Sequence, residues 1–131
     1  MSRIFADAFY FIARLNRRDQ HHRKALSLTT PPETGLVTTE WVLVEDGLAN
    51  SEVRSRIREV IHFLQRSPGS EVVPATSELL AQALDLYHQH RDKEWTLTDC
   101  TSFIVMRERG LTEALTGDHH FEQAGFTALL K

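Results

Sequence analysis

The chain has 131 residues, is 41% hydrophobic and 25% charged, and carries a formal net charge of −3. That length suits a single domain, 1–131, and the composition is typical of a globular protein rather than of a nucleic-acid binder that depends on bulk positive charge. No apolar run approaches the ~20 residues of a membrane helix, and one cysteine, Cys100, excludes an internal disulfide, so we expect a cytoplasmic protein without a membrane segment.

Strand and helix patterns alternate along the chain. The predicted strands are Arg3–Ala6, Leu36–Val37, Val72–Val73, Ala114–Thr116 and Phe126–Leu130. The first predicted helix carries Phe9 to Leu15 at helical spacing and ends near Asn16 to Asp19, and the next covers His21–Leu28. Further helices are predicted after Thr38 or Thr39, over Arg54–Gln65, and from Thr76 or Ser77, the last with a core face that includes Leu84 and Tyr87. Thr96 opens and Gly110 closes another helix, and His119–Ala124 is a short segment. This alternation predicts an α/β fold with a parallel sheet covered on both faces.

Three aspartates occupy the starts of predicted helices. Asp7 and Asp118 each follow a strand, at the carboxyl ends where open α/β sheets place their ligand sites. Asp99 lies in the first helical turn, in the capping-box pattern Thr96-x-x-Asp99. For each aspartate alone, helix capping is the better-supported interpretation. Their joint placement favours a common site instead.

A fourth acid, Glu45, falls inside an apolar stripe. At 100° per residue, Trp41, Val44, Glu45 and Leu48 share one face of the predicted helix that follows the second strand. A carboxylate in a buried face is costly unless something neutralises it. We therefore expect Glu45 to point inward and to join the three aspartates.

Four carboxylates in one pocket cannot all stay ionised without a cation, because like charges a few ångströms apart repel. Oxygen ligands without cysteine select a hard divalent ion, Mg²⁺ or Mn²⁺. The matching chemistry is phosphodiester hydrolysis, in which the metal acidifies a water and shields the phosphate. The four acids Asp7, Glu45, Asp99 and Asp118 are thus both the predicted metal ligands and the predicted catalytic residues.

Two pairs of adjacent histidines do not indicate zinc. His21-His22 and His119-His120 are neighbours in sequence, so each pair should point in different directions on a helix. A solvated surface is the favoured interpretation for the second pair, although a histidine beside Asp118 could contact a phosphate or assist proton transfer. Cys100 is interpreted as a small core residue.

Four segments resemble the acidic blocks of PIN-domain proteins, specifically the VapC-like ribonuclease toxins. The segments are FADAFYFIA, TTEWVLVEDGLA, WTLTDCTSFIVMRERG and ALTGDHHFEQAGF, and together they extend over essentially the whole chain. The resemblance implies metal-binding acids at Asp7, Glu45, Asp99 and Asp118, and a three-layer α/β/α fold. It also implies Mg²⁺- or Mn²⁺-dependent cleavage of RNA, a homodimer, and inhibition by a cognate antitoxin.

One position departs from the family pattern. The family usually has Thr or Ser after the first aspartate, where this chain has Ala8. A hydroxyl that helps to hold the metal-bound water is therefore missing there, and Thr98 or Thr101 is the expected replacement. The departure leaves open a catalytically weak or inactive PIN-like module that binds RNA or protein. A structure-specific nuclease acting on DNA would share the same metal site.

Overall fold

A computed structural model describes residues 2–28, 34–44 and 50–131. Five strands form one sheet in the order β3-β2-β1-β4-β5, and every neighbouring pair is parallel. The strands are β1 (Arg3–Ala6), β2 (Gly35–Thr39), β3 (Glu71–Val73), β4 (Glu113–Leu115) and β5 (Thr127–Ala128). Because the chain alternates strands and helices, each strand can return in the same direction, as parallel pairing requires.

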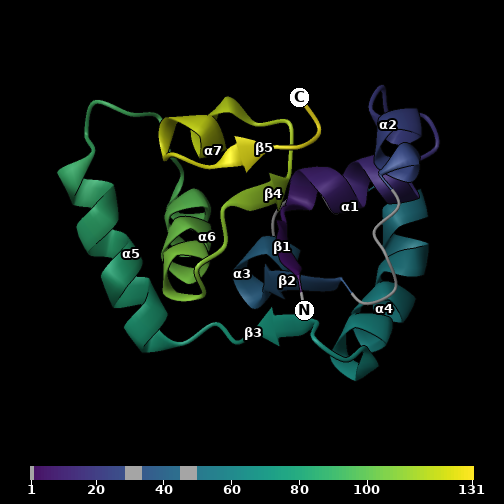
Figure 1. Ribbon diagram of the computed structural model, residues 1–131, viewed down its shortest axis with the longest axis horizontal. Helices are drawn as coiled ribbons and strands as arrows, with labels where there is room; N and C mark the ends of the chain where they lie inside the picture. The colour runs from purple at the N-terminus through teal and green to yellow at the C-terminus, as the bar shows by residue number, and fades with distance from the viewer. Residues whose placement is uncertain (1, 29–33, 45–49) are drawn as a thin grey trace.

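The helices form a layer on each side of the sheet (Figure 1). They are α1 (Ala8–Leu15), α2 (His22–Ser27), α3 (Glu40–Leu43), α4 (Ser51–Arg66), α5 (Ser77–Gln89), α6 (Leu97–Glu108) and α7 (His119–Gln123). On one side α1 packs against α2 and α4, and on the other α6 packs against α3, α5 and α7. This arrangement confirms the predicted three-layer α/β/α fold.

Aromatic side chains fill the space between α6, α7 and the sheet. Phe103 of α6 is fully buried, and its ring meets the rings of Trp95 and Phe121 edge-on, each at a centroid distance of 5.0 Å. Phe5 of β1 continues this cluster toward the centre of the sheet, 6.2 Å from Phe121. Edge-on contacts align the positive ring edge with a negative ring face, which fixes how α6 and α7 sit on the sheet.

No helix in the described part of the chain is long and apolar enough to cross a membrane.

The predicted buried faces of α3 and α5 each include residues that the structure leaves exposed. The helix after β2 is a single turn, and Val44, which caps its C-terminus, is 71% exposed whereas Val42 is buried. The helical spacing that placed Val44 inward does not hold past the end of that turn. On α5 the buried residues include Leu86, whereas Leu84 and Tyr87 are exposed. The reason is that α5 lies on the outside of α6, the helix on which it mainly packs (Figure 1).

We expect Phe103→Ala to lower the free energy of unfolding by about 3–5 kcal/mol, because it leaves a cavity in the aromatic cluster. Phe63→Ala is the matched control, since Phe63 is 65% exposed and its loss should change stability by no more than about 0.5 kcal/mol. Urea denaturation followed by circular dichroism measures both. Equal losses in the two variants would contradict the assignment of Phe103 to the core.

Candidate active site

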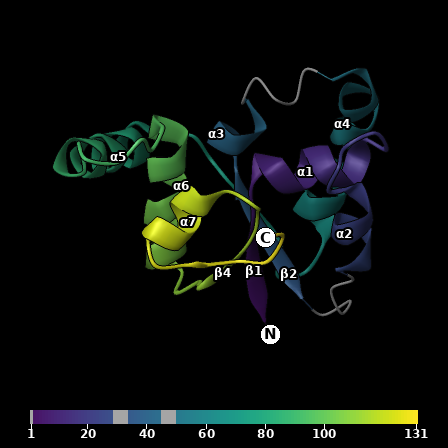
Figure 2. The ribbon, with the colours of Figure 1, turned by 90° about the horizontal axis from the view of Figure 1, so that it is seen from above.

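The three described acids lie at the point where the chain's connections change sides of the sheet. From β1 the chain proceeds through α1 and α2 to β2, whereas β4, the other neighbour of β1, is reached through α5 and α6. Open α/β sheets bind ligands outside the carboxyl ends of the strands at such a switch point. Asp7 follows β1 and Asp118 follows β4 after two residues, so both reach this edge, where α1 begins (Figure 2).

Asp7 occupies the N-cap position of α1, but its carboxylate makes no capping hydrogen bond. Instead, Oδ2 accepts a 3.0 Å hydrogen bond from the hydroxyl of Thr116, which lies 109 residues away in sequence. Asp7 is also 7% exposed, so its carboxylate is withdrawn from water. The capping interpretation therefore fails for Asp7, and the side chain is available for another role.

Asp99 is a cap and a site residue at once. Its Oδ2 accepts from the backbone N–H of Thr96 at 3.0 Å, and this bond completes the predicted capping box. The same oxygen accepts from Nδ1 of His120 at 2.9 Å. A carboxylate can only accept here, so the proton of this imidazole lies on Nδ1. No residue in the described ranges donates to Oδ1, so that oxygen is left for a cation.

Asp118 is hydrogen-bonded to both Thr116 and His120, the residues that hold Asp7 and Asp99. Its Oδ1 accepts from the backbone N–H of His120 at 2.9 Å and lies 3.4 Å from Nδ1 of that histidine. Its own N–H donates to the Thr116 hydroxyl at 3.1 Å. Thr116 thus bridges Asp7 and Asp118, and His120 bridges Asp99 and Asp118. Within the described ranges Oδ2 of Asp118 has no hydrogen-bond donor.

The two adjacent histidines differ in the way they meet these acids. His120 has a side chain that is 15% exposed and contacts Asp99, so the surface interpretation is wrong for it. His119 has a side chain that is 61% exposed, as predicted, and its Nδ1 lies 3.6 Å from Asp118 Oδ1. Asp118, His119 and His120 each offer a ligand atom within 4.8 Å of the others. The argument that neighbouring histidines cannot converge is therefore wrong here, because the pair begins a helix over the capping carboxylate.

The pKa of Asp7 is raised to about 6, chiefly because the carboxyl group is buried; the Thr116 hydroxyl lowers this pKa, and the Asp99 and Asp118 charges add smaller increases. Three acids from distant parts of the chain therefore interact electrostatically. A buried carboxylate with two further carboxylates nearby is the kind of group that marks a functional site. The same surroundings raise the pKa of the buried Cys100 thiol to about 11, first through burial and then through Asp99, which fits a core residue rather than a nucleophile.

Two sequence predictions about this site concern Glu45 and the hydroxyl that is missing at Ala8. Glu45 lies outside the described residues, and the exposure of Val44 removes one support for its predicted inward face. The Thr101 hydroxyl donates to the carbonyl of Thr98 at 2.6 Å, and whether Thr98 or Thr101 makes up for the hydroxyl missing at Ala8 stays a prediction. The hydroxyl on Asp7 comes from Thr116, two residues before Asp118. That Thr-x-Asp spacing was visible in the sequence, but its reach to Asp7 depends on the pairing of β1 with β4.

No protein-family model matches the chain. Among curated proteins it is 31% identical over 124 residues to VapC20, a 23S rRNA-specific endonuclease of Mycobacterium tuberculosis strains H37Rv and CDC 1551. The alignment covers 94% of this chain and 95% of the relative. The chain belongs to the VapC family of PIN-domain ribonuclease toxins.

A crystal structure supports the same family. The structure of M. tuberculosis VapC20, described as a sarcin–ricin loop cleaving toxin, matches with a TM-score of 0.79 and 29% sequence identity over 95% of this chain and 96% of that one. As a VapC-like ribonuclease the chain is an enzyme, which removes the non-catalytic binding module from the open alternatives.

The raised pKa of Asp7 gives a pH dependence that can be measured without metal. The folded state holds this proton more tightly than the unfolded chain, so the contribution to stability is complete below about pH 4 and is lost as the pH rises through about 6. Asp7→Asn keeps an acceptor for Thr116 but carries no charge. In EDTA it should therefore become more stable than the wild type by about 2–3 kcal/mol above pH 6, an order-of-magnitude value.

Urea denaturation at pH 4 to 8 measures the difference between the two proteins. Asp92→Asn is the control, because Lys93 lowers the pKa of that exposed carboxyl. A stability gain of Asp7→Asn that does not change with pH would contradict the raised pKa.

Proposed function

We propose that Asp7, Asp99 and Asp118, joined by Glu45, bind Mg²⁺ or Mn²⁺ and catalyse hydrolysis of RNA phosphodiester bonds. The observation that carries the proposal is the convergence of three acids at the switch point between β1 and β4, where Thr116 joins Asp7 to Asp118 and His120 joins Asp99 to Asp118. The donor set contains carboxylate oxygens, which hard divalent ions prefer. When bound, such an ion supplies a Lewis acid that acidifies water and shields the phosphate.

The surrounding residues orient these acids. Thr116 holds one oxygen of Asp7, while Thr96 and His120 hold Oδ2 of Asp99. The remaining oxygens of Asp99 and Asp118 can then face the cation and the substrate. Hydrogen bonds to ligating carboxylates fix their direction and commonly change metal affinity 10- to 100-fold when removed. We infer that Asp7, whose pKa is raised to about 6 chiefly by burial, accepts the proton from the attacking water.

The substrate proposed is structured RNA, with a ribosomal RNA loop as the first candidate. VapC20 is named as a 23S rRNA-specific endonuclease and a sarcin–ricin loop cleaving toxin, and it aligns with nearly all of this chain. The family also supports a cognate antitoxin protein as partner, a homodimer as the assembled form, and activity in the cytoplasm. DNA remains the contrasting substrate in a panel of labelled hairpin RNA, single-stranded RNA and hairpin DNA.

Asp7→Asn and Asp99→Asn should each lower the rate of Mn²⁺-dependent RNA cleavage by about 100-fold or more, because each removes a charge that holds the ion. Glu45→Gln should do the same. Asp92→Asn, which removes an exposed carboxylate elsewhere, should leave the rate unchanged. Cleavage of labelled RNA on gels, with and without EDTA, measures all four variants, and full activity in Asp99→Asn would overturn the assignment.

Thr116→Val should weaken Mn²⁺ binding by roughly 10- to 100-fold while the protein stays folded, because valine keeps the shape but gives Asp7 no hydroxyl. Isothermal titration calorimetry of Mn²⁺ into the apo protein measures the affinity. Thr127→Val, at an exposed strand position, is the matched control. Unchanged affinity in Thr116→Val would show that the hydroxyl does not orient the ligand.

A further inference from the structure

Phe9 of α1 meets Gly117 beside the acids. Phe9 lies two residues after Asp7, in the first turn of α1, and Gly117 lies between Thr116 and Asp118 in the segment that follows β4. A Cβ at position 117 would lie 2.5 Å from Cζ of the Phe9 ring and 2.9 Å from Cε1. Carbon atoms in contact are normally separated by about 3.5–4.0 Å. The ring therefore occupies the space that any side chain at position 117 would need.

The Phe9 ring is also packed against His21. The centroids of the two rings are 4.8 Å apart, and their planes meet at 60°. Phe9 is partly buried against the hydrophobic core, so the ring has packed neighbours in addition to Gly117. A ring with such neighbours cannot turn away from position 117 without losing those contacts. The close approach to Gly117 is thus part of the packing and not the position of a free side chain.

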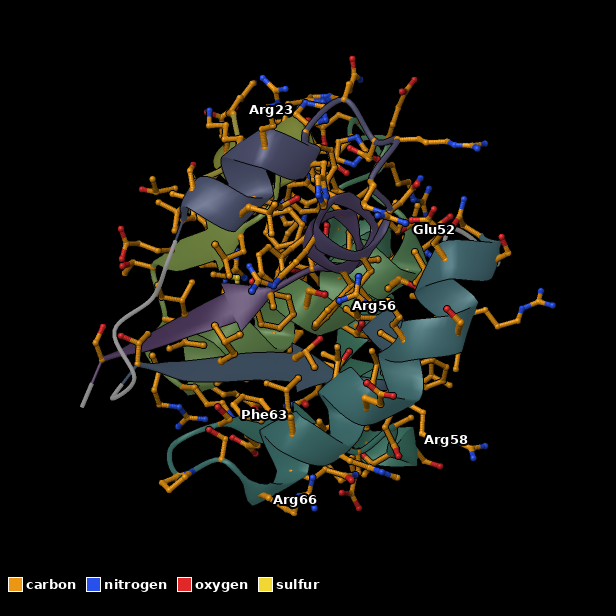
Figure 3. All side chains as sticks on the ribbon, turned by 90° about the vertical axis from the view of Figure 1, so that its right-hand side faces the viewer. Arg23, Glu52, Arg56, Arg58, Phe63 and Arg66 are labelled. Atoms are coloured by element: carbon orange, nitrogen blue, oxygen red, sulfur yellow. The ribbon has the colours of Figure 1, made fainter. Side chains whose placement is uncertain are left out.

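The segment that carries His21 is itself anchored. In the connection between α1 and α2, the backbone N–H of Arg17 donates to Oε2 of Glu52 at 3.2 Å. Glu52 lies in the first turn of α4, at the end of that helix nearest to this connection (Figure 3). The backbone N–H of His21 donates to Oδ1 of Asp19 at 2.8 Å. These hydrogen bonds hold the connection in place, and with it His21 beside Phe9.

We propose that Phe9 is a positioning residue of the active site, which sets the place of Asp118 relative to Asp7 by packing on Gly117. The proposal rests on the metal-binding function proposed above. Thr116 connects the segments of the two acids through its hydroxyl, and this connection alone would let the chain pivot at that residue. The contact of Phe9 with Gly117 restrains the chain one residue further along. Ligands must be held within about 0.5 Å of the productive geometry, so a second restraint has a measurable effect on metal binding.

A role in packing alone predicts a different result from a positioning role. If the ring only filled space, a Cβ at position 117 would lower stability and leave the metal site unchanged. If the ring holds the chain, the same Cβ displaces the residues around Gly117. On one side of Gly117 the carbonyl of Thr116 accepts from the N–H of Leu130 at 2.9 Å, which fixes that residue. The displacement is therefore passed toward Asp118.

Rescue by a second substitution tests the match between the two positions. Gly117→Ala should weaken Mn²⁺ binding roughly tenfold or more, as removal of other groups that orient metal ligands does. Phe9→Leu/Gly117→Ala lacks the Cζ and Cε atoms that the new Cβ meets, so it should bind Mn²⁺ more tightly than Gly117→Ala does. Two unrelated defects would add instead. Isothermal titration calorimetry of Mn²⁺ into the apo proteins measures the affinities, with Phe9→Leu as the second single variant.

Gly110→Ala separates metal affinity from stability. Gly110 follows α6 at the end opposite Asp99 and has a φ of +65°, so an alanine there is strained. In the described part of the chain nothing lies within 4 Å of the added Cβ. This variant should lose stability in urea denaturation and bind Mn²⁺ like the wild type. Equal losses of affinity in Gly110→Ala and Gly117→Ala would overturn the positioning role, because stability alone would then account for both.

The same titrations distinguish this proposal from the proposed function. Mn²⁺ binding that is lost in Asp99→Asn but unchanged in Gly117→Ala would overturn the positioning role alone. A double variant that binds no better than Gly117→Ala would also overturn it, since the Phe9 ring would not be the group that the Cβ meets. A wild type that binds no Mn²⁺ would reject the metal site and the positioning role with it. The expected result is that the rates of Mn²⁺-dependent RNA cleavage follow the order of the measured affinities.

Discussion

The burial of a carboxylate at the end of β1 is the constraint on which the rest of the site depends. Burial is the main cause that raises the pKa of Asp7 to about 6, and the charges of Asp99 and Asp118 add smaller contributions in the same direction. A fold tolerates such a cluster only if the surrounding packing holds it in place. Here the aromatic cluster around Phe103 fixes α6 and α7 on the sheet, and these helices carry Asp99 and the capping Asp118.

Two side chains connect these acids into one unit. Thr116 donates to Asp7 and accepts from the backbone of Asp118, while His120 donates to Asp99 beside Asp118. Helix capping and site construction therefore use the same groups. A capping carboxylate already has one oxygen fixed, which leaves the second oriented at little further entropic cost. This holds for Asp99 and Asp118, which cap α6 and α7, whereas the Asp7 carboxylate is held by Thr116 instead.

The distribution of charge complements the site. The acids gather at the switch point, and the arginines gather on the layer of α1, α2 and α4. A polyanion approaching this protein meets attraction on one layer and repulsion at the centre until a cation neutralises the acids.

The sequence by itself determined the α/β class, the order of strands and helices, and three of the acids that the structure brings together, because strand ends and helix caps are local patterns. It also carried the resemblance to the VapC family in the blocks around Asp7, Asp99 and Asp118. Only the tertiary structure decided which hydroxyl reaches Asp7, since Thr116 meets it through the pairing of β1 with β4. The same holds for the exposure of Val44 and for the contact of His120 with Asp99, because burial depends on neighbours that are distant in the chain.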